Sequence, residues 1–209
     1  MKIALFGATG FSGRAVLRTA LAEGHVVRAL VRDPSRLAVH EGSLEVIQGD
    51  ALSLDPVRET LKGVDVVVHC LGVGGKGTGQ PTTLVSDSVS LVLTAMQELG
   101  VSRIVCMSNV GAGGSGTWLA NRVVIPLFVR WLRPLIDDKD RMEALLAESP
   151  LDWVSVRLPN IVEGPEAPVQ TSADGRGLSL SITTGSVARV LLDQATTGPV
   201  DGPTPSVSN

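Results

Sequence analysis

The fold is decided by residues 7–13, Gly7-Ala8-Thr9-Gly10-Phe11-Ser12-Gly13, which follow the apolar run Lys2–Phe6 and open the helix-length segment Gly13–Glu23. In the spacing G-x-x-G-x-x-G, the first glycine permits a sharp turn, the second lets the backbone approach a pyrophosphate, and the third lets the helix pack against the strand. The helix then offers free N–H groups and the positive end of its dipole to phosphate. The stretch therefore predicts a dinucleotide-binding turn, with a glycine turn that binds no ligand as the alternative. The residues expected at the ligand are Gly7, Thr9, Gly10, Phe11, Ser12 and Gly13.

Outward from this turn, short apolar runs alternate with helix-length segments. The expected strands are Lys2–Phe6, His25–Val31, Leu44–Gln48, Val64–Cys70, Arg103–Ser108 and Trp153–Arg157. The expected helices are Gly13–Glu23, Asp55–Lys62, Thr82–Leu99 and Asp138–Glu148. Nearly continuous apolar runs are typical of strands that are covered on both faces. The pattern predicts a single α/β domain over residues 1–209, with a Rossmann-like, doubly wound parallel sheet.

Two segments interrupt the alternation, a variable segment at 110–135 and a Gly/Pro-rich loop at 159–177. Both follow the carboxyl ends of expected strands, where open α/β sheets bind ligands, so we expect 159–177 to form a loop of the acceptor site. The variable segment combines glycines and apolar bulk with Arg122, Arg130 and Arg133. One hypothesis is a mobile cover whose arginines meet an anionic group of the substrate. Core packing and a dimer contact are the alternatives.

The second expected strand ends in Val31-Arg32-Asp33-Pro34-Ser35-Arg36. An acidic residue at this tip favours the ribose 2′-hydroxyl of NAD, whereas arginine accommodates the 2′-phosphate of NADP. We therefore expect NADP(H), held through Arg32, Ser35 and Arg36, because guanidinium groups bind phosphate bidentately. The alternative is that Asp33 takes the ribose and the arginines are solvated. After the third strand, the adenine edge is expected at Asp50 and Ala51.

Composition excludes several classes of function. The 209 residues carry a net charge of -3 and no basic stripe, so nucleic acid is not an expected partner. No run of 18 apolar residues is present, which predicts a protein without a membrane span and cytoplasmic by default. The two cysteines and three histidines have no metal-ligand spacing, so no metal is expected. The chain contains no tyrosine, which removes every mechanism that needs a tyrosyl hydroxyl.

The sequence resembles the atypical short-chain dehydrogenase/reductases of the NmrA-like kind, in the group that includes the flavin and biliverdin reductases. The resemblance extends over nearly the whole chain. It rests on FGATGFSGR, VRDPSRL, QGDAL, the segment from Leu71 to Thr83, CMSN at Cys106–Asn109, DDKDRM at Asp137–Met142 and ADGRG at Ala173–Gly177. Such proteins move a hydride from NADPH to flavins, biliverdins or other flat conjugated acceptors. The expected partner is therefore a small aromatic or tetrapyrrole acceptor, and the expected state is a monomer or homodimer.

The resemblance also implies individual site residues. Leu71 and Gly72 match a cofactor-binding position, and Ser108 matches a serine that lies beside the nicotinamide. Asn160 stands where many of these reductases have a histidine, a departure that concerns the acceptor rather than the cofactor. We expect Ser108 and Asn160 to orient nicotinamide or acceptor, with Ser108 as a candidate proton relay. The alternative for Ser108 is a hydroxyl that caps backbone at a strand end.

Better-known short-chain dehydrogenases use Tyr and Lys four residues apart. If Lys139 takes the lysine position, the tyrosine position falls on Leu135, which donates no proton. Carbonyl–alcohol interconversion needs a placed acid or base, so it is disfavoured. A flavin or tetrapyrrole gives a delocalised anion and chiefly needs its ring stacked and oriented. The alternatives are a redox sensor that binds NADP(H) without turnover, and a biosynthetic reductase or isomerase on the same scaffold.

Overall fold

The computed structural model describes residues 1–37, 42–73, 79–113, 115, 132–197 and 202–209. The strands are β1 (Lys2–Phe6), β2 (Val26–Val31), β3 (Leu44–Gln48), β4 (Val66–His69), β5 (Arg103–Gly113), β6 (Asp152–Leu158), β7 (Asn160–Val162), β8 (Gln170–Ser172), β9 (Ser181–Thr183) and β10 (Ser206–Ser208). The helices are α1 (Phe11–Ala22), the short 3₁₀ turn η1 (Pro34–Arg36), α2 (Leu54–Leu61), α3 (Leu84–Leu99), α5 (Arg133–Glu148) and α6 (Thr184–Thr197).

Eight strands form the main sheet, in the order β3-β2-β1-β4-β5-β6-β10-β8. Every pairing from β3 to β10 is parallel, and β8 joins the edge antiparallel. The chain builds outward from β1 to β3, then returns to β4 on the other side of β1. This reversal is the topological switch point at which open α/β sheets bind their ligands. The expected doubly wound, Rossmann-like α/β fold is confirmed.

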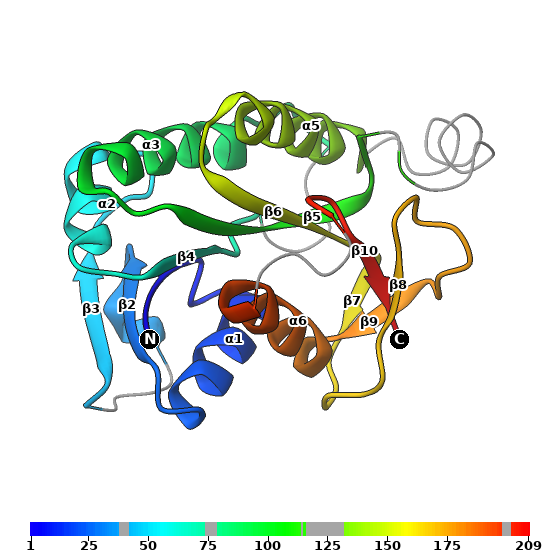
Figure 1. Ribbon diagram of the computed structural model, residues 1–209, viewed down its shortest axis with the longest axis horizontal. Coiled ribbons are helices and arrows are strands. Elements are labelled where there is room, and N and C mark those ends of the chain that lie inside the picture. The colour runs from blue at the N-terminus through cyan, green and yellow to red at the C-terminus, as the bar shows by residue number, and fades with distance from the viewer. Residues whose placement is uncertain (38–41, 74–78, 114, 116–131, 198–201) are drawn as a thin grey trace.

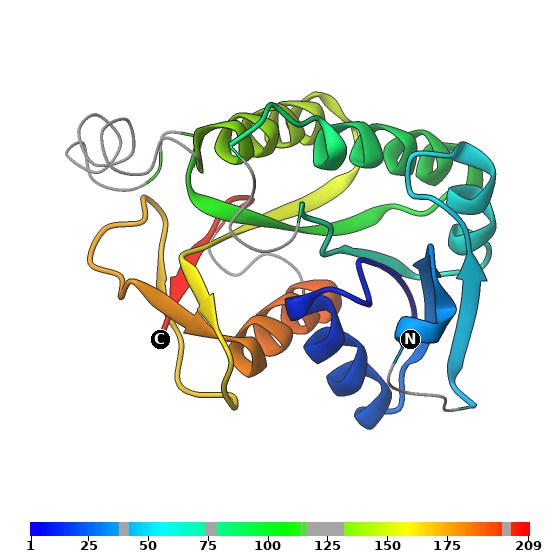
Figure 2. The ribbon, with the colours of Figure 1, turned by 180° about the vertical axis from the view of Figure 1, so that it is seen from behind.

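Helices cover both faces of the sheet (Figure 1). Helices α3 and α5 lie side by side along one face together with α2, whereas α1 and α6 pack against each other on the opposite face. The view from behind shows the same two layers, with the small parallel sheet of β7 and β9 beside α6 (Figure 2). The carboxyl ends of β1 to β6 therefore meet at one edge, between the two helical layers.

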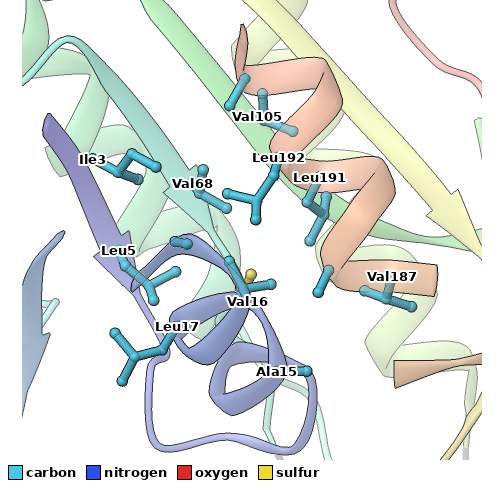
Figure 3. Packing of buried hydrophobic residues seen from close by; sticks show 14 of the residues in the cluster. Ile3, Leu5, Ala15, Val16, Leu17, Val68, Val105, Val187, Leu191 and Leu192 are labelled. Atoms are coloured by element: carbon cyan, nitrogen blue, oxygen red, sulfur yellow. The ribbon is translucent and has the colours of Figure 1, made fainter. Parts of the chain in front are cut away.

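The core on the α1 and α6 face is aliphatic (Figure 3). Strand residues Ile3, Leu5 and Val68 meet Val16 of α1 and Leu192 of α6, and all five are at most 1% exposed. Burial of each such side chain is worth about 1.5–3 kcal/mol. This packing fixes α1, and with it the turn that precedes the helix.

Several predicted boundaries were wrong. Strand β5 continues beyond Ser108 to Gly113, and Gly111 and Gly113 in this extension take positive φ, which glycine tolerates. Helix α5 begins at Arg133 instead of Asp138, with Pro134 in its first turn, where the missing N–H costs nothing. Both ends of the 110–135 segment are thus regular structure. Of that segment, residues 114 and 116–131, with Arg122 and Arg130, lie outside the described residues.

The carboxyl-terminal third contains more structure than the sequence predicted. The expected loop 159–177 includes β7 and β8, and the chain adds β9, α6 and β10 after it. Four of these elements are strands of three residues, too short to show hydrophobic periodicity. Strand β10 inserts beside β6 at the sheet edge.

Candidate active site

The glycine turn is built as its spacing predicts. Gly7 has a φ of 86°, and a Cβ on it would lie 2.7 Å from the carbonyl oxygen of Cys70, at the end of β4. A Cβ on Gly13 would lie 2.1 Å from the carbonyl oxygen of Gly7, so α1 can pack this closely only with glycine there. The turn closes through a hydrogen bond of 2.9 Å from Gly10 N to Gly7 O.

The amino end of α1 is left open to a ligand. The N-cap residue is Gly10, in extended conformation and without a side-chain capping bond, so the first N–H groups of the helix have no side-chain acceptor. Ser12 is buried, and its contribution to a phosphate would be its backbone N–H. Phe11 is 57% exposed at the same end. An uncapped helix start of this kind favours an anion.

Arg32 and Arg36 follow the carboxyl end of β2, and both residues are exposed. Asp33 instead serves the local turn: one of its carboxylate oxygens accepts hydrogen bonds from Ser35 N at 3.0 Å and Ser35 Oγ at 2.7 Å. These two bonds hold the pKa of Asp33 below its usual value. Asp33 therefore caps η1. This role disfavours the alternative in which the Asp33 carboxylate is free to bind a ribose.

The neighbouring strand ends carry the other residues expected at the cofactor. Asp50 is exposed after β3 and accepts a hydrogen bond from Leu52 N at 3.0 Å, whereas Ala51 is buried beside it. Leu71 is half-buried and Gly72 exposed after β4. Because β1 to β4 are parallel neighbours, these residues share the edge that holds the glycine turn.

Ser108 lies in the carboxyl-terminal half of β5, and Lys139 of α5 approaches the same strand. The Ser108 side chain is buried, and its Oγ has no hydrogen-bond partner within the described residues. The alternative in which Ser108 caps backbone is therefore wrong. Lys139 is also buried, and its Nζ donates to Met107 O at 2.5 Å and to Leu71 O at 3.4 Å. Leu135, one helical turn earlier, is half-buried.

Asn160 opens β7, with its side chain exposed and its N–H donating to Leu180 O at 3.2 Å. The structure gives no contact that brings Asn160 to Ser108, so the two expected orienting residues are not joined directly. Leu180 is 89% exposed, an unusual state for a leucine.

A nicotinamide dinucleotide fits this edge of the sheet. The edge carries a turn in which Gly7 and Gly13 leave no room for a side chain, the uncapped start of α1, and the exposed Arg32 and Arg36. The family model for NAD(P)H-binding proteins matches residues 7–197. The chain belongs to this NAD(P)H-binding family. The resemblance and the nicotinamide cofactor expected from the sequence are thereby confirmed at the level of the family.

Two curated relatives of this NAD(P)H-binding protein share about a third of their aligned residues with it. An uncharacterized protein of Mycobacterium tuberculosis is 29% identical over 157 residues, which is 75% of this chain and 14% of that protein. Reductase pytE of Aspergillus terreus is 32% identical over 178 residues, which is 70% of this chain and 66% of the reductase. The chain thus spans a small part of the first relative and about two thirds of the second.

Solved structures share the whole fold. A short-chain dehydrogenase/reductase of Veillonella parvula in complex with NADP has a TM-score of 0.82 at 14% identity and covers 100% of this chain and 94% of the other. ChuY, an anaerobilin reductase of Escherichia coli O157:H7, has a TM-score of 0.81 at 20% identity, with coverages of 100% and 97%. At such identities the likeness concerns the fold.

One residue at the site of the NAD(P)H-binding protein has a role that the sequence did not predict. The Asp138 carboxylate accepts hydrogen bonds from Val85 N at 2.9 Å and Ser86 N at 3.1 Å, so it caps the amino end of α3 from α5. Arg141 reaches the same place and donates to Thr82 O. The motif DDKDRM was the available signal, but the expected helix Asp138–Glu148 placed Asp138 at the start of its own helix.

The buried histidine and thiols beside the edge are structural. His69 Nε2 lies 3.1 Å from Ser88 Oγ, its ring stacks on Phe6, and burial lowers its pKa to about 3. Burial raises the pKa of Cys70 and of Cys106 to about 12, which leaves both as unreactive thiols. Within the described residues, no cluster of potential metal ligands is present.

A cavity of about 340 Å³ opens along α1, next to the glycine turn. Its wall includes Phe11, Arg14 and Arg18 of α1, Leu37 after η1, and Glu163 after β7. The guanidinium groups of Arg14 and Arg18 thus face the cavity from α1.

Among the helices that the structure describes, none is long and apolar enough to cross a membrane.

Proposed function

We propose that this NAD(P)H-binding protein is an NADPH-dependent reductase that delivers hydride to a flat conjugated acceptor, a flavin or a bilin-like tetrapyrrole. The observation that carries the proposal is the arrangement of Leu135, Lys139 and Ser108. Ser108 lies on β5 just past the residues paired with β4, Lys139 of α5 bonds the adjacent Met107 carbonyl, and the position that would hold a tyrosyl acid in other dehydrogenases is aliphatic. Acceptors whose anion is delocalised tolerate this gap, whereas a simple carbonyl does not.

The proposed cofactor contacts follow the edge of the sheet. The glycine turn with Thr9, Phe11 and Ser12 holds the pyrophosphate, Arg32, Ser35 and Arg36 hold the 2′-phosphate, Asp50 and Ala51 border the adenine, and Leu71, Gly72 and Ser108 border the nicotinamide. NADPH supplies a hydride when bound. The exposed state of Arg32 and the engagement of Asp33 with Ser35 support the phosphate-bearing cofactor.

Ser108 is the proposed polar contact of the reacting rings. Its hydroxyl is buried without a described partner, so it remains able to donate to a carbonyl of the nicotinamide or the acceptor. Asn160 is proposed to orient the acceptor from the β7 side. A carboxamide orients by hydrogen bonding but does not titrate, so protonation of the product is left to Ser108 or to water.

The relatives are consistent with this proposal in different ways. Reductase pytE is a reductase by name, ChuY is an anaerobilin reductase and so acts on a tetrapyrrole, and the Veillonella protein binds NADP. The same fold thus binds NADP in the Veillonella protein and serves an anaerobilin reductase in ChuY. The acceptor of the present chain is our inference from its own site.

The test is the loss of NADPH absorbance on adding FMN, riboflavin or biliverdin to the purified protein. Steady turnover that falls strongly in Ser108→Ala supports the proposal. Tight NADPH binding without turnover of any of the three acceptors would overturn it and favour a redox sensor, for which Asn160 in place of a histidine is the favouring observation. Turnover of a hydroxysteroid-like or other alicyclic substrate instead would favour a biosynthetic enzyme.

A further inference from the structure

Lys139 places a buried cation at the edge of the sheet where the nicotinamide is proposed to lie. The residue is 4% exposed, and its Nζ bonds the backbone carbonyls of Met107 and Leu71. These carbonyls belong to β5 and to the segment that follows β4. The ammonium therefore bridges β5 and the segment after β4, at the level where β4 ends, on the side covered by α5.

Within the described residues, Lys139 makes no ion pair, although the charges of Asp138 and Glu143 partly offset the effect of burial on its pKa. Asp138 and Asp140 adjoin Lys139 in sequence. The two oxygens of Asp138 accept the N–H groups of Val85 and Ser86, and Asp140 accepts the N–H of Gly113. Glu143, one turn further along α5, is bound to the Arg157 guanidinium at 2.6 Å and to Ser155 Oγ at 2.9 Å. None of these three acids forms an ion pair with the Lys139 ammonium, so the described part of the chain gives it two carbonyl oxygens and no paired counter-ion.

The other titratable groups around Lys139 stay neutral. Cys70 and Cys106 keep their protons because burial raises the pKa of each thiol to about 12. His69 stays uncharged because burial lowers its pKa to about 3. A buried ammonium without a counter-ion is costly, and such a group is retained more readily where it acts on a ligand.

We propose that Lys139 sets the preference of the site for the reduced cofactor, because its ammonium repels the positively charged nicotinamide ring of NADP⁺ and tolerates the neutral ring of NADPH. This inference rests on the proposed function, which places the nicotinamide at the ends of β4 and β5. The consequence for turnover is direct: the oxidised product is bound less tightly than the reduced substrate and leaves the site.

The experiment measures the dissociation constants of NADPH and NADP⁺ by titration, and compares their ratio between variants. In the parent protein NADPH should bind at least about tenfold more tightly than NADP⁺, as expected for two charges a few ångströms apart in a partly buried site. Lys139→Met and Lys139→Gln should bring the ratio close to one, and Lys139→Arg should preserve it. The glutamine variant keeps an N–H donor, so it separates loss of charge from loss of the bond to Met107.

Arg103→Met is the matched control. Arg103 is a cation at the opposite end of the same strand β5, where it bonds the backbone carbonyl of Gln194 at 3.0 Å. Its removal should leave the ratio unchanged. If the lysine variants do not fold, the pH dependence of the parent protein tests the inference instead. The preference for NADPH over NADP⁺ should fall as pH rises and Lys139 loses its proton. Because burial lowers the pKa of Lys139, this fall should occur at a pH below the usual lysine range.

The outcomes separate the inference from the proposed function. A parent ratio near one, or a ratio that survives in Lys139→Met, would overturn the role of Lys139 while acceptor reduction by NADPH stands. Failure to bind either form of the cofactor would overturn the proposed function itself. A ratio that falls equally in Arg103→Met would assign the effect to general loss of positive charge and contradict the inference.

Discussion

We propose that single residues at the tip of β2 set the preference for one dinucleotide over another. Arg32 is exposed at the tip of β2, while the adjacent Asp33 is held by Ser35. In many dehydrogenases an acid at this tip would bind the ribose of NAD. Here the acid caps η1, and the guanidinium is left for the ligand.

We therefore expect Arg32→Glu to lower the preference for NADPH over NADH at least about tenfold, because a charged contact to phosphate is worth roughly 1.5–3 kcal/mol. The measurement is the ratio of the two dissociation constants. Lys62→Glu is the control, since Lys62 is an exposed cation after the carboxyl end of α2, at the other edge of the sheet. Equal affinity of the parent protein for both cofactors would contradict the assignment.

A second prediction at this scale concerns the contact between the turn and its helix. Gly13→Ala should lower the free energy of unfolding by about 1–3 kcal/mol, because its Cβ has no room against Gly7 O. Denaturant unfolding measures the change. Gly42→Ala, whose Cβ would meet nothing within 4 Å, should have little effect, and an equal loss in both variants would refute the steric explanation.

At the scale of elements, α5 does more than cover the sheet. It carries Lys139 to the ends of β4 and β5, and Asp138 to the start of α3. The N-cap residue of α3, Thr83, makes no side-chain capping bond, so the carboxylate of another helix takes its place. The position of α3 beside the cofactor edge thus depends on α5.

Removal of this cap should loosen α3. We expect Asp138→Asn to cost about 1–2 kcal/mol in the free energy of unfolding, because the amide keeps one acceptor oxygen, turns its NH2 group toward the other N–H and removes the negative charge from the amino end of α3. Protection of the α3 amide hydrogens against exchange should fall first at Val85 and Ser86. The matched control is Asp137→Asn, because the neighbouring Asp137 pairs with Arg133 at the surface, where such pairs contribute little. Equal effects of the two substitutions would exclude the capping role.

The same elements show how far the sequence could be interpreted. The turn at Gly7–Gly13 and the six longer strands were predictable, because spacing and apolar runs are local signals. The strands β7 to β10 were not, since three residues carry no period and their pairing is set by distant segments. The cap from Asp138 joins residues more than fifty positions apart in the chain, so its local sequence indicated a helix start instead. The positions of Ser108 on β5 and of Arg32 after β2 follow from the apolar runs, whereas the bonds of Lys139 depend on packing.

Across the whole molecule, the sheet buries polar and titratable groups near its functional edge, and these make stability depend on pH. His69 is fully buried between β1 and β5, and burial lowers its pKa from about 6.5, the value of a free histidine, to about 3. Between these two values the unfolded chain binds a proton that the folded chain excludes. Stability contributed by neutral His69 is therefore present above about pH 6.5 and is lost as pH falls toward 3.

The last prediction follows from this linkage. The free energy of unfolding should fall on acidification below pH 6.5, and His69 should account for up to about 1.4 kcal/mol per pH unit of the slope. The double variant His69→Leu/Ser88→Ala removes the ring together with its hydroxyl partner and should show a shallower slope between pH 6 and 4, whatever its absolute stability. Ser88→Ala alone keeps the histidine and should keep the slope. Parallel curves for the two variants would mean that His69 takes up its proton in the folded protein, and would place the acid sensitivity of the fold in other groups.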